Sequence, residues 1–135
     1  MSNNNNLHAA KKAKNDEFYT QYGDIASELR HYWDSLKGQR VLCPCDDYRR
    51  SNFYKYFKDN FRYIGLNTLI ATNYDTGDGA WKCVYDGEKE TVTRLDGDGD
   101  FRSQEVTEIK DSEADIVVTN PPFSLFREFV AWLYE

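Results

Sequence analysis

The chain has 135 residues, which is enough for one domain with a buried core. Aromatic residues make up 16% of it, including 10 Tyr and 8 Phe, and this content excludes a disordered chain. The net charge of -6 would repel a phosphate backbone, so any contact with nucleic acid must be local or supplied by other residues.

Signals for secretion, membranes and metals are missing from the sequence. No apolar run has the length of a signal-peptide core or of a membrane span of about 20 residues. The three cysteines, Cys43, Cys45 and Cys83, do not have the spacing of zinc ligands. The acidic run at residues 96–100 lacks the glycine and glutamate positions of a calcium loop. We therefore expect a cytoplasmic protein with free thiols, no metal and no membrane contact.

The first half of the chain predicts a tail, two helices and a strand. Residues 1–16 hold an Asn run and three Lys with almost nothing apolar, which is typical of a flexible tail or of an arm that contacts nucleic acid. Residues 25–36 repeat apolar side chains every three or four positions before Gly38, which predicts one amphipathic helix. Residues 40–44 predict a short buried strand, and residues 51–61 an aromatic-rich helix capped by Ser51 or Asn52.

The second half predicts further strands. Residues 69–72 form a candidate strand, and residues 81–85 and 90–95 flank a turn and predict a β-hairpin. Residues 114–119 are the clearest strand, because their centre is continuously apolar and two prolines end it. Ser124 is placed to cap a closing helix. This alternation predicts an α/β sheet with a ligand crevice at the carboxyl ends of its strands.

A polar amide, two prolines and an aromatic residue follow the last strand directly, as Asn120-Pro121-Pro122-Phe123. The Asn120 side-chain oxygen and the Pro121 carbonyl are two acceptors that the prolines hold in place. They suit an amine whose lone pair is delocalised into an aromatic ring, as in adenine, and Phe123 can stack on that ring after the base is extruded from a duplex. These are also ordinary turn residues, so the tetrapeptide alone fits a plain strand-ending turn too.

Other segments accompany this motif: Asn15 to Tyr22, Cys43 to Asp47 with Ser51-Asn52-Phe53, and Gly99 to Ser103. Together they resemble the EcoRI-type adenine-specific (N6) DNA methyltransferase family, from Asn15 to the end of the chain. The resemblance implies a Rossmann-like α/β fold and S-adenosylmethionine-dependent methylation of adenine N6 in duplex DNA by base flipping, in a modification or restriction-modification system. It assigns catalysis to Asn120, Pro121, Pro122 and Phe123.

The resemblance and the expected strand ends also imply a cofactor site made by several loops. Its residues are Phe18, Tyr19, Thr20, Cys43, Pro44, Cys45, Asp46, Asp75, Asp100 and Phe101. Asp46 would accept from the cofactor's cationic amine, Asp75 from its ribose and Asp100 from its adenine amine, with Phe101 against the adenine ring. Packing at the start of the first helix for residues 18–20, and a solvated turn for Asp75, remain open alternatives. The loop after the first strand departs from the usual Gly-x-Gly pattern, since no glycine lies between Gly38 and Gly65.

Sheets of this family normally have seven strands, whereas we expect about four here together with an inserted β-hairpin. Residues 17–135 would therefore be the N-terminal part of a truncated methyltransferase domain, with the target-recognition domain absent. Duplex DNA would be bound mainly by residues that this chain lacks, and turnover by the fragment alone is not expected. The alternatives are a non-catalytic methyltransferase-like binding module, or an enzyme that methylates amino groups of RNA or protein.

Overall fold

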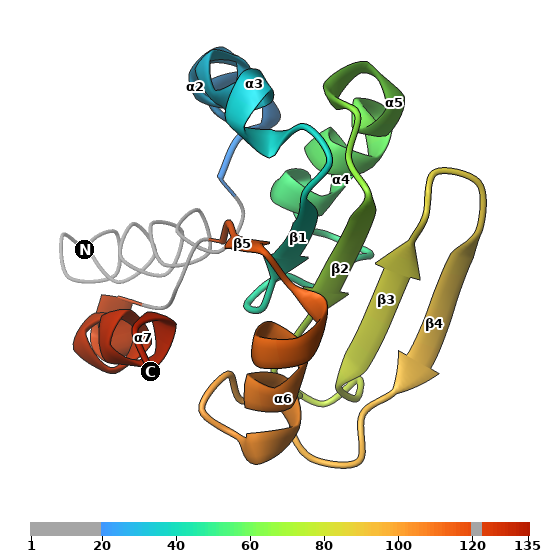
Figure 1. Ribbon diagram of the computed structural model, residues 1–135. Helices are drawn as coiled ribbons and strands as arrows, with labels where there is room; N and C mark the ends of the chain where they lie inside the picture. Colours follow the sequence, from blue (N-terminus) through green and yellow to red (C-terminus); the bar gives the residue numbers. More distant parts are fainter. Residues whose placement is uncertain (1–19, 120–122) are drawn as a thin grey trace, which may run out of the picture.

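The computed structural model describes residues 20–119 and 123–135. Its five strands form one sheet in the order β4-β3-β2-β1-β5 (Figure 1). The strands are β1 (Arg40–Cys43), β2 (Thr68–Thr72), β3 (Trp81–Tyr85), β4 (Glu90–Arg94) and β5 (Ile116–Val117). The helices are α2 (Tyr22–Leu29), η1 (Arg30–Tyr32), α3 (Trp33–Leu36), α4 (Asn52–Asp59), α5 (Phe61–Ile64), α6 (Gln104–Glu113), η2 (Phe123–Leu125) and α7 (Phe126–Leu133). The expected α/β class is confirmed.

Strand β1 lies between β2 and β5 and runs parallel to both. Strand β3 pairs antiparallel with β2, and β4 pairs antiparallel with β3. The described sheet thus has five strands instead of about four, because β3 pairs with β2 from Leu69 to Thr72 and brings β4 into the same sheet. After β1, the chain forms β2 on one side of β1, and it later forms β5 on the other side.

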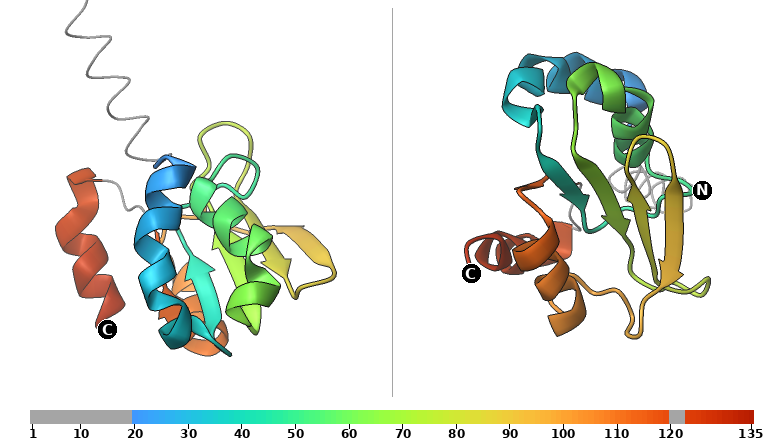
Figure 2. Two further views of the ribbon diagram at one scale, coloured as in Figure 1. Left: turned by 90° about the horizontal axis from the view of Figure 1, so that it is seen from above. Right: turned by 45° about the vertical axis from the view of Figure 1, so that its right-hand side comes forward.

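Helices cover both faces of the sheet, as Figure 2 shows from two directions. Alternate residues of β1 explain this, because Val41 and Cys43 point to one face and Leu42 to the other. The first face packs against α2 to α5, with Phe57 fully buried there. The second face packs against α6 and α7 through Val106, among others. Strands buried from both sides need the continuous apolar runs that β1 and β2 have.

Three details differ from the sequence predictions. The helix expected at residues 25–36 is divided by η1, where the Trp33 amide bonds to the Arg30 carbonyl three residues back. Strand β5 has only two paired residues, both half-buried, because only β1 pairs with it in the described part of the chain. Ser124 is not a helix cap, because it lies inside η2 and the N-cap of α7 is Leu125.

Helix α6 was not predicted at all. Only Val106 and Ile109 are apolar on its buried face, so the sequence gives little helical periodicity there. Ser103 caps this helix by accepting from the Val106 amide at 3.2 Å. Within the described residues, no helix is both long and apolar enough to cross a membrane.

Candidate active site

The carboxyl ends of β1, β2 and β5 meet at one edge of the sheet, since the three strands are parallel neighbours. The chain turns from β1 to opposite sides for β2 and β5, so this edge contains the point where the strand order reverses. Open α/β sheets bind ligands in the crevice outside such a point. Most of the predicted site residues that the structure describes lie in the loops that follow these strands.

The loop after β1 is held by a buried carboxylate. Asp46 is 2% exposed, and its Oδ1 accepts from the Ser51 hydroxyl at 2.7 Å. Its Oδ2 accepts from the Thr119 hydroxyl, which lies just after β5. Burial raises the pKa of Asp46 to about 6, although both hydroxyl donors act in the opposite direction. Within the described residues, no cationic side chain forms an ion pair with Asp46.

The cysteines and proline of this loop lie inside the protein. Cys43 and Pro44 are buried, and the half-buried Cys45 donates its amide to the Thr119 hydroxyl at 3.2 Å. Burial, followed by the negative charge of Asp46, raises the pKa of both thiols. The thiols are therefore neutral at physiological pH and pack as small, weakly polar side chains.

Side chains of the loop after β2 hold it in place by hydrogen bonds to the nearby backbone. The buried Asn73 donates to the Gly79 carbonyl at 3.0 Å and accepts from the Trp81 amide at 3.0 Å. Asp75 Oδ1 accepts from the amides of Gly77 at 2.8 Å and Gly79 at 3.0 Å, and these bonds lower its pKa. Asp75 is therefore ionised at neutral pH and fixed at the sheet edge.

The acidic loop before α6 is brought to the same edge by Gly99. Gly99 has a φ of +78°, and a Cβ there would lie 1.9 Å from the Asn73 carbonyl oxygen. The Asp75 amide also donates to the Asp98 carbonyl at 2.7 Å. Asp100 accepts from the Arg102 guanidinium at 2.7 and 3.0 Å, and this pairing lowers its pKa. Two predicted acidic residues, Asp75 and Asp100, therefore lie in neighbouring loops.

Phe101 lies deeper than the rest of that loop. Its side chain is 4% exposed and packs edge-on against Phe129, with ring centroids 5.2 Å apart, and against Trp132 at 5.4 Å. Both partners belong to α7, which follows the predicted catalytic segment in the chain. Phe101 thus joins the acidic loop to α7, and its contact with a ligand ring remains a prediction.

The N-terminal and catalytic segments are described only at their borders. The Thr20 carbonyl accepts from the Asn52 side chain at 2.9 Å, which places Thr20 at the start of α4. Phe18 and Tyr19 lie outside the described residues, as do Asn120, Pro121 and Pro122. Phe123 is the first residue of η2. Thr119, directly before Asn120, is bonded to the loop after β1.

Sequence reasoning did not assign site roles to three residues that shape this edge: Ser51, Asn73 and Thr119. Ser51 was expected only as a helix cap, which it is, because its hydroxyl accepts from the Tyr54 amide at 3.1 Å. A hydroxyl or amide residue directly at a strand end was the available signal for Asn73 and Thr119. Within residues 20–119 and 123–135, no group of three or more His, Cys, Asp or Glu side chains is arranged to hold a metal ion.

Comparison with known proteins agrees with the resemblance seen in the sequence. A family model described as "Adenine-specific methyltransferase EcoRI" matches residues 6–135. Type II methyltransferase M.EcoRI of Escherichia coli is 45% identical over 92% of this chain and 43% of its own length. Type II methyltransferases M.MpnI of Mycoplasma pneumoniae and M.MgeORF184P of Mycoplasma genitalium are 44% and 42% identical, each over 93% of this chain and 39% of their own length.

The chain thus spans about two fifths of the length of these curated relatives. No solved structure shows significant similarity to it. The family match covers nearly the whole sequence, including every predicted site residue. The chain belongs to the EcoRI family of adenine-specific methyltransferases.

Proposed function

We propose that this chain carries the cofactor-binding and catalytic part of an S-adenosylmethionine-dependent enzyme that methylates adenine N6 in duplex DNA. The observation that carries the proposal is the meeting of three loops and one strand end at one sheet edge: the Asp46, Asp75 and Asp100 loops, and the end of the strand that leads into Asn120. The relatives are Type II methyltransferases, which supports a role in DNA modification or restriction-modification.

The residues at this edge fit the cofactor chemically. S-adenosylmethionine has a cationic amino group, two ribose hydroxyls and an adenine amine, all of which are hydrogen-bond donors. Asp46 is a buried carboxylate without a cationic partner among the described residues, so a ligand amine would offset its charge. Asp75 and Asp100 are ionised and retain lone pairs for the ribose and the adenine amine, since each carboxylate oxygen accepts more than one bond.

The remaining predicted contacts surround these acids. Phe18, Tyr19 and Thr20 would line the methionine end, and Thr20 lies beside the start of α4. Cys43, Pro44 and Cys45 would form the floor, where their neutral and buried side chains exclude water. Phe101 would support the adenine ring from the protein side.

The catalytic step belongs to residues 120–123. When bound, the cofactor supplies an electrophilic methyl group. Asn120 and the Pro121 carbonyl would accept hydrogen bonds from the N6 amine, which holds the nitrogen lone pair toward the methyl group. N6 would gain the methyl group as the donor's sulfur–carbon bond breaks and its electron pair stays on sulfur, and N6 would release one proton to water. Pro122 stiffens the loop, and Phe123 would stack on the adenine after the base leaves the duplex.

This chain would make only some of the contacts with duplex DNA. Its net charge of -6 opposes phosphate binding, and a neutralising contact is needed for each phosphate that is bound. We propose that residues 17–135 form the N-terminal part of the methyltransferase domain. DNA recognition would then depend mainly on the portion that the relatives have outside the matched two fifths.

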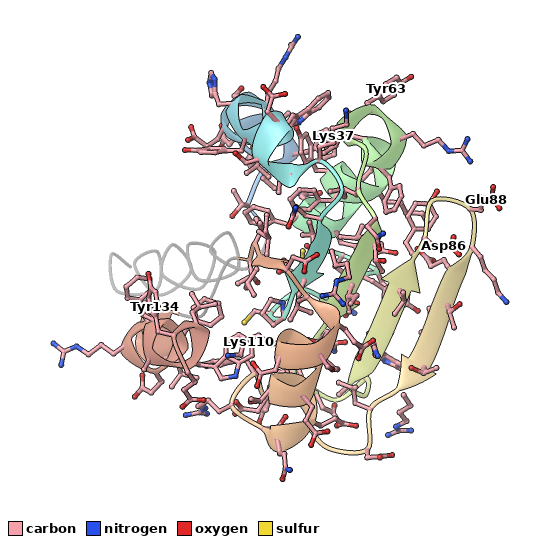
Figure 3. The ribbon with its side chains drawn as sticks, viewed as in Figure 1. Lys37, Tyr63, Asp86, Glu88, Lys110 and Tyr134 are labelled. Atoms are coloured by element: carbon pink, nitrogen blue, oxygen red, sulfur yellow. The ribbon has the colours of Figure 1, made fainter. Side chains whose placement is uncertain are left out.

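Calorimetric titration with S-adenosylhomocysteine, the demethylated product, tests the cofactor site. Asp75→Ala and Asp100→Ala should each weaken binding about tenfold or more, as expected for a lost charge-assisted hydrogen bond. Asp86→Ala is the matched control, because Asp86 also accepts from two turn amides, at 2.9 and 2.8 Å, and its pKa is also lowered. Asp86 lies in the turn between β3 and β4, at the opposite sheet edge (Figure 3). Equal losses in all three variants would contradict the proposed site.

Transfer of labelled methyl groups to duplex DNA, RNA and protein, measured on a full-length enzyme that contains this chain, tests the catalytic assignment. Asn120→Ala should abolish transfer to DNA and leave affinity for S-adenosylhomocysteine unchanged. Retained transfer in this variant would remove Asn120 from the mechanism. Cofactor binding without transfer to any acceptor would instead favour a non-catalytic binding module, and transfer to RNA or protein alone would replace DNA as the substrate.

A further inference from the structure

The side chain of Thr119 joins two loops that the proposed function assigns to different tasks. Its hydroxyl donates to Asp46 Oδ2 and accepts from the Cys45 amide at 3.2 Å. Both partners lie in the loop after β1, 73 and 74 residues earlier in the chain. The backbone before Thr119 is fixed as well, since the Val118 amide donates to the Leu42 carbonyl at 2.9 Å. Thr119 therefore ends β5 on a defined point of the cofactor loop.

The contact continues into the core. Asp46 and Ser51 are 2% and 3% exposed, and the Ser51 hydroxyl donates to Asp46 Oδ1 at 2.7 Å. Ser51 in turn accepts from the Tyr54 amide in the first turn of α4. Thr119, Asp46, Ser51 and α4 thus form one continuous chain of hydrogen bonds. Buried polar networks whose members are all satisfied are rigid, so this chain fixes the position of the Thr119 hydroxyl.

We propose that Thr119 is a positioning residue for methyl transfer: its hydroxyl fixes the end of β5 on the cofactor loop and thereby sets the starting point of the Asn120 loop. Thr119 directly precedes Asn120, and consecutive Cα atoms are about 3.8 Å apart across a trans peptide, so a shift of Thr119 would shift the start of the Asn120 loop with it. Displacement of a reacting group by about 1 Å can reduce a rate by about a hundredfold. The inference rests on the proposed function, and Thr119 itself is not assigned any contact with substrate or cofactor.

The helix that follows residues 120–122 in the chain is held by α6. The buried Lys110 of α6 donates from Nζ to the Trp132 carbonyl of α7 at 2.8 Å, and Figure 3 shows it between these two helices. The Trp132 indole donates to the Thr107 hydroxyl at 2.9 Å. These contacts lie near the end of α7, whereas Thr119 directly precedes Asn120 and contacts the cofactor loop.

Three variants separate the hydroxyl from the rest of the side chain. Thr119→Val keeps the shape but leaves the Cys45 amide and Asp46 Oδ2 without their partner. Thr119→Ser keeps the hydroxyl and should rescue the function. Thr72→Val is the matched control, because Thr72 is 0% exposed at the end of β2 and its hydroxyl donates to the Pro44 carbonyl at 3.2 Å, in the same loop. Thr72→Val would thus lose a hydrogen bond to the cofactor loop that is comparable to those of Thr119 but does not involve β5.

Amide hydrogen exchange measured by NMR on the folded chain tests the anchoring without any need for turnover. Thr119→Val should speed exchange at the hydrogen-bonded amides of Cys45 and Val118 by about tenfold or more, which corresponds to the loss of one buried hydrogen bond. Thr119→Ser and Thr72→Val should change exchange at Val118 by less than about threefold. Unchanged exchange at Val118 in Thr119→Val would overturn the proposal.

Steady-state methyl transfer tests the consequence for the reaction. Thr119→Val should lower kcat by about tenfold to a hundredfold and change the affinity for S-adenosylhomocysteine less, because Asp46 keeps its bond from Ser51 while the segment after β5 loses both side-chain bonds to the cofactor loop. Thr119→Ser should restore kcat, and Thr72→Val should retain it. Wild-type kcat in Thr119→Val would overturn the inference and leave the proposed function intact. The kcat measurement uses a full-length enzyme that contains this chain, and an inactive wild-type enzyme would count against the proposed function while the exchange experiment decides on the anchoring alone.

Discussion

Replacement of Asp46 by Asn should change how the stability of the protein depends on pH. Burial raises the pKa of this carboxyl from its ordinary value of 3.8 to about 6. A raised folded-state pKa means that folding favours the protonated form, so Asp46 stabilises the fold most at low pH. This contribution is lost as the pH rises from about 4 to about 6, and the two pKa values correspond to about 3 kcal/mol. The side-chain amide of the Asp46→Asn variant would not titrate, so the variant would lack this slope.

The free energy of unfolding can be measured by urea titration at several pH values between 4 and 7, with tryptophan fluorescence as the signal. The difference between Asp46→Asn and the wild type should grow by about 2 kcal/mol in favour of the variant as the pH rises from 4 to 6, and then level off near pH 7. Acids with lowered pKa, such as Asp75 and Glu90, titrate in both proteins, so they cancel in this difference. A difference that is independent of pH would refute a buried carboxylate at this position.

Two further pairs of variants test the packing around the site, with urea titration as the measurement. Gly99→Ala would place its Cβ 1.9 Å from the Asn73 carbonyl oxygen at a φ of +78°, and should cost more than about 2 kcal/mol. Gly97→Ala, with its nearest neighbour at 3.4 Å, should cost less than about 1 kcal/mol. Phe129→Ala removes a ring that is 4% exposed and should cost about 3 to 5 kcal/mol. Phe126→Ala, on the same helix but 51% exposed, should cost about 1 kcal/mol or less, and equal costs within either pair would contradict the described packing.

The strands could be predicted from the sequence where their apolar pattern agrees with their burial and pairing in the sheet. Strands β1 to β4 lie within one residue of the predicted ranges, because β1 and β2 are buried on both faces and turn residues separate β3 from β4. Strand β5 has an equally apolar sequence but only two paired residues. Pairing depends on neighbouring strands, and the apolar run alone could not indicate that only β1 would pair with it in the described residues.

The sequence predicted which loops lie together better than it predicted the contacts between them. The loops after β1, β2 and β5 were expected at one sheet edge, which the structure confirms, since neighbouring parallel strands end together. The bond from Thr119 to Asp46 joins residues 73 positions apart, and no local pattern encodes such a partner. The approach of Gly99 to Asn73 was also invisible, because a glycine in an acidic run is typical of a simple turn. Catalytic and cofactor roles of the individual residues stay predictions.

The position of β5 beside β1 has a consequence for how the protein folds. Arg40 and Asp115 form a two-pronged ion pair across this strand boundary, although 75 residues separate them in the chain. The loop that must close when β1 pairs with β2 is much shorter than the one that must close when β1 pairs with β5. The entropic cost of closing a loop rises with its length. We therefore expect β1 and β2 to associate early and β5 to dock late, after α6 has formed. During synthesis on the ribosome, the edge formed by the carboxyl ends of β1, β2 and β5 would then be the last part of this sheet to be completed, and one side of β1 would stay unpaired until residue 118 has emerged.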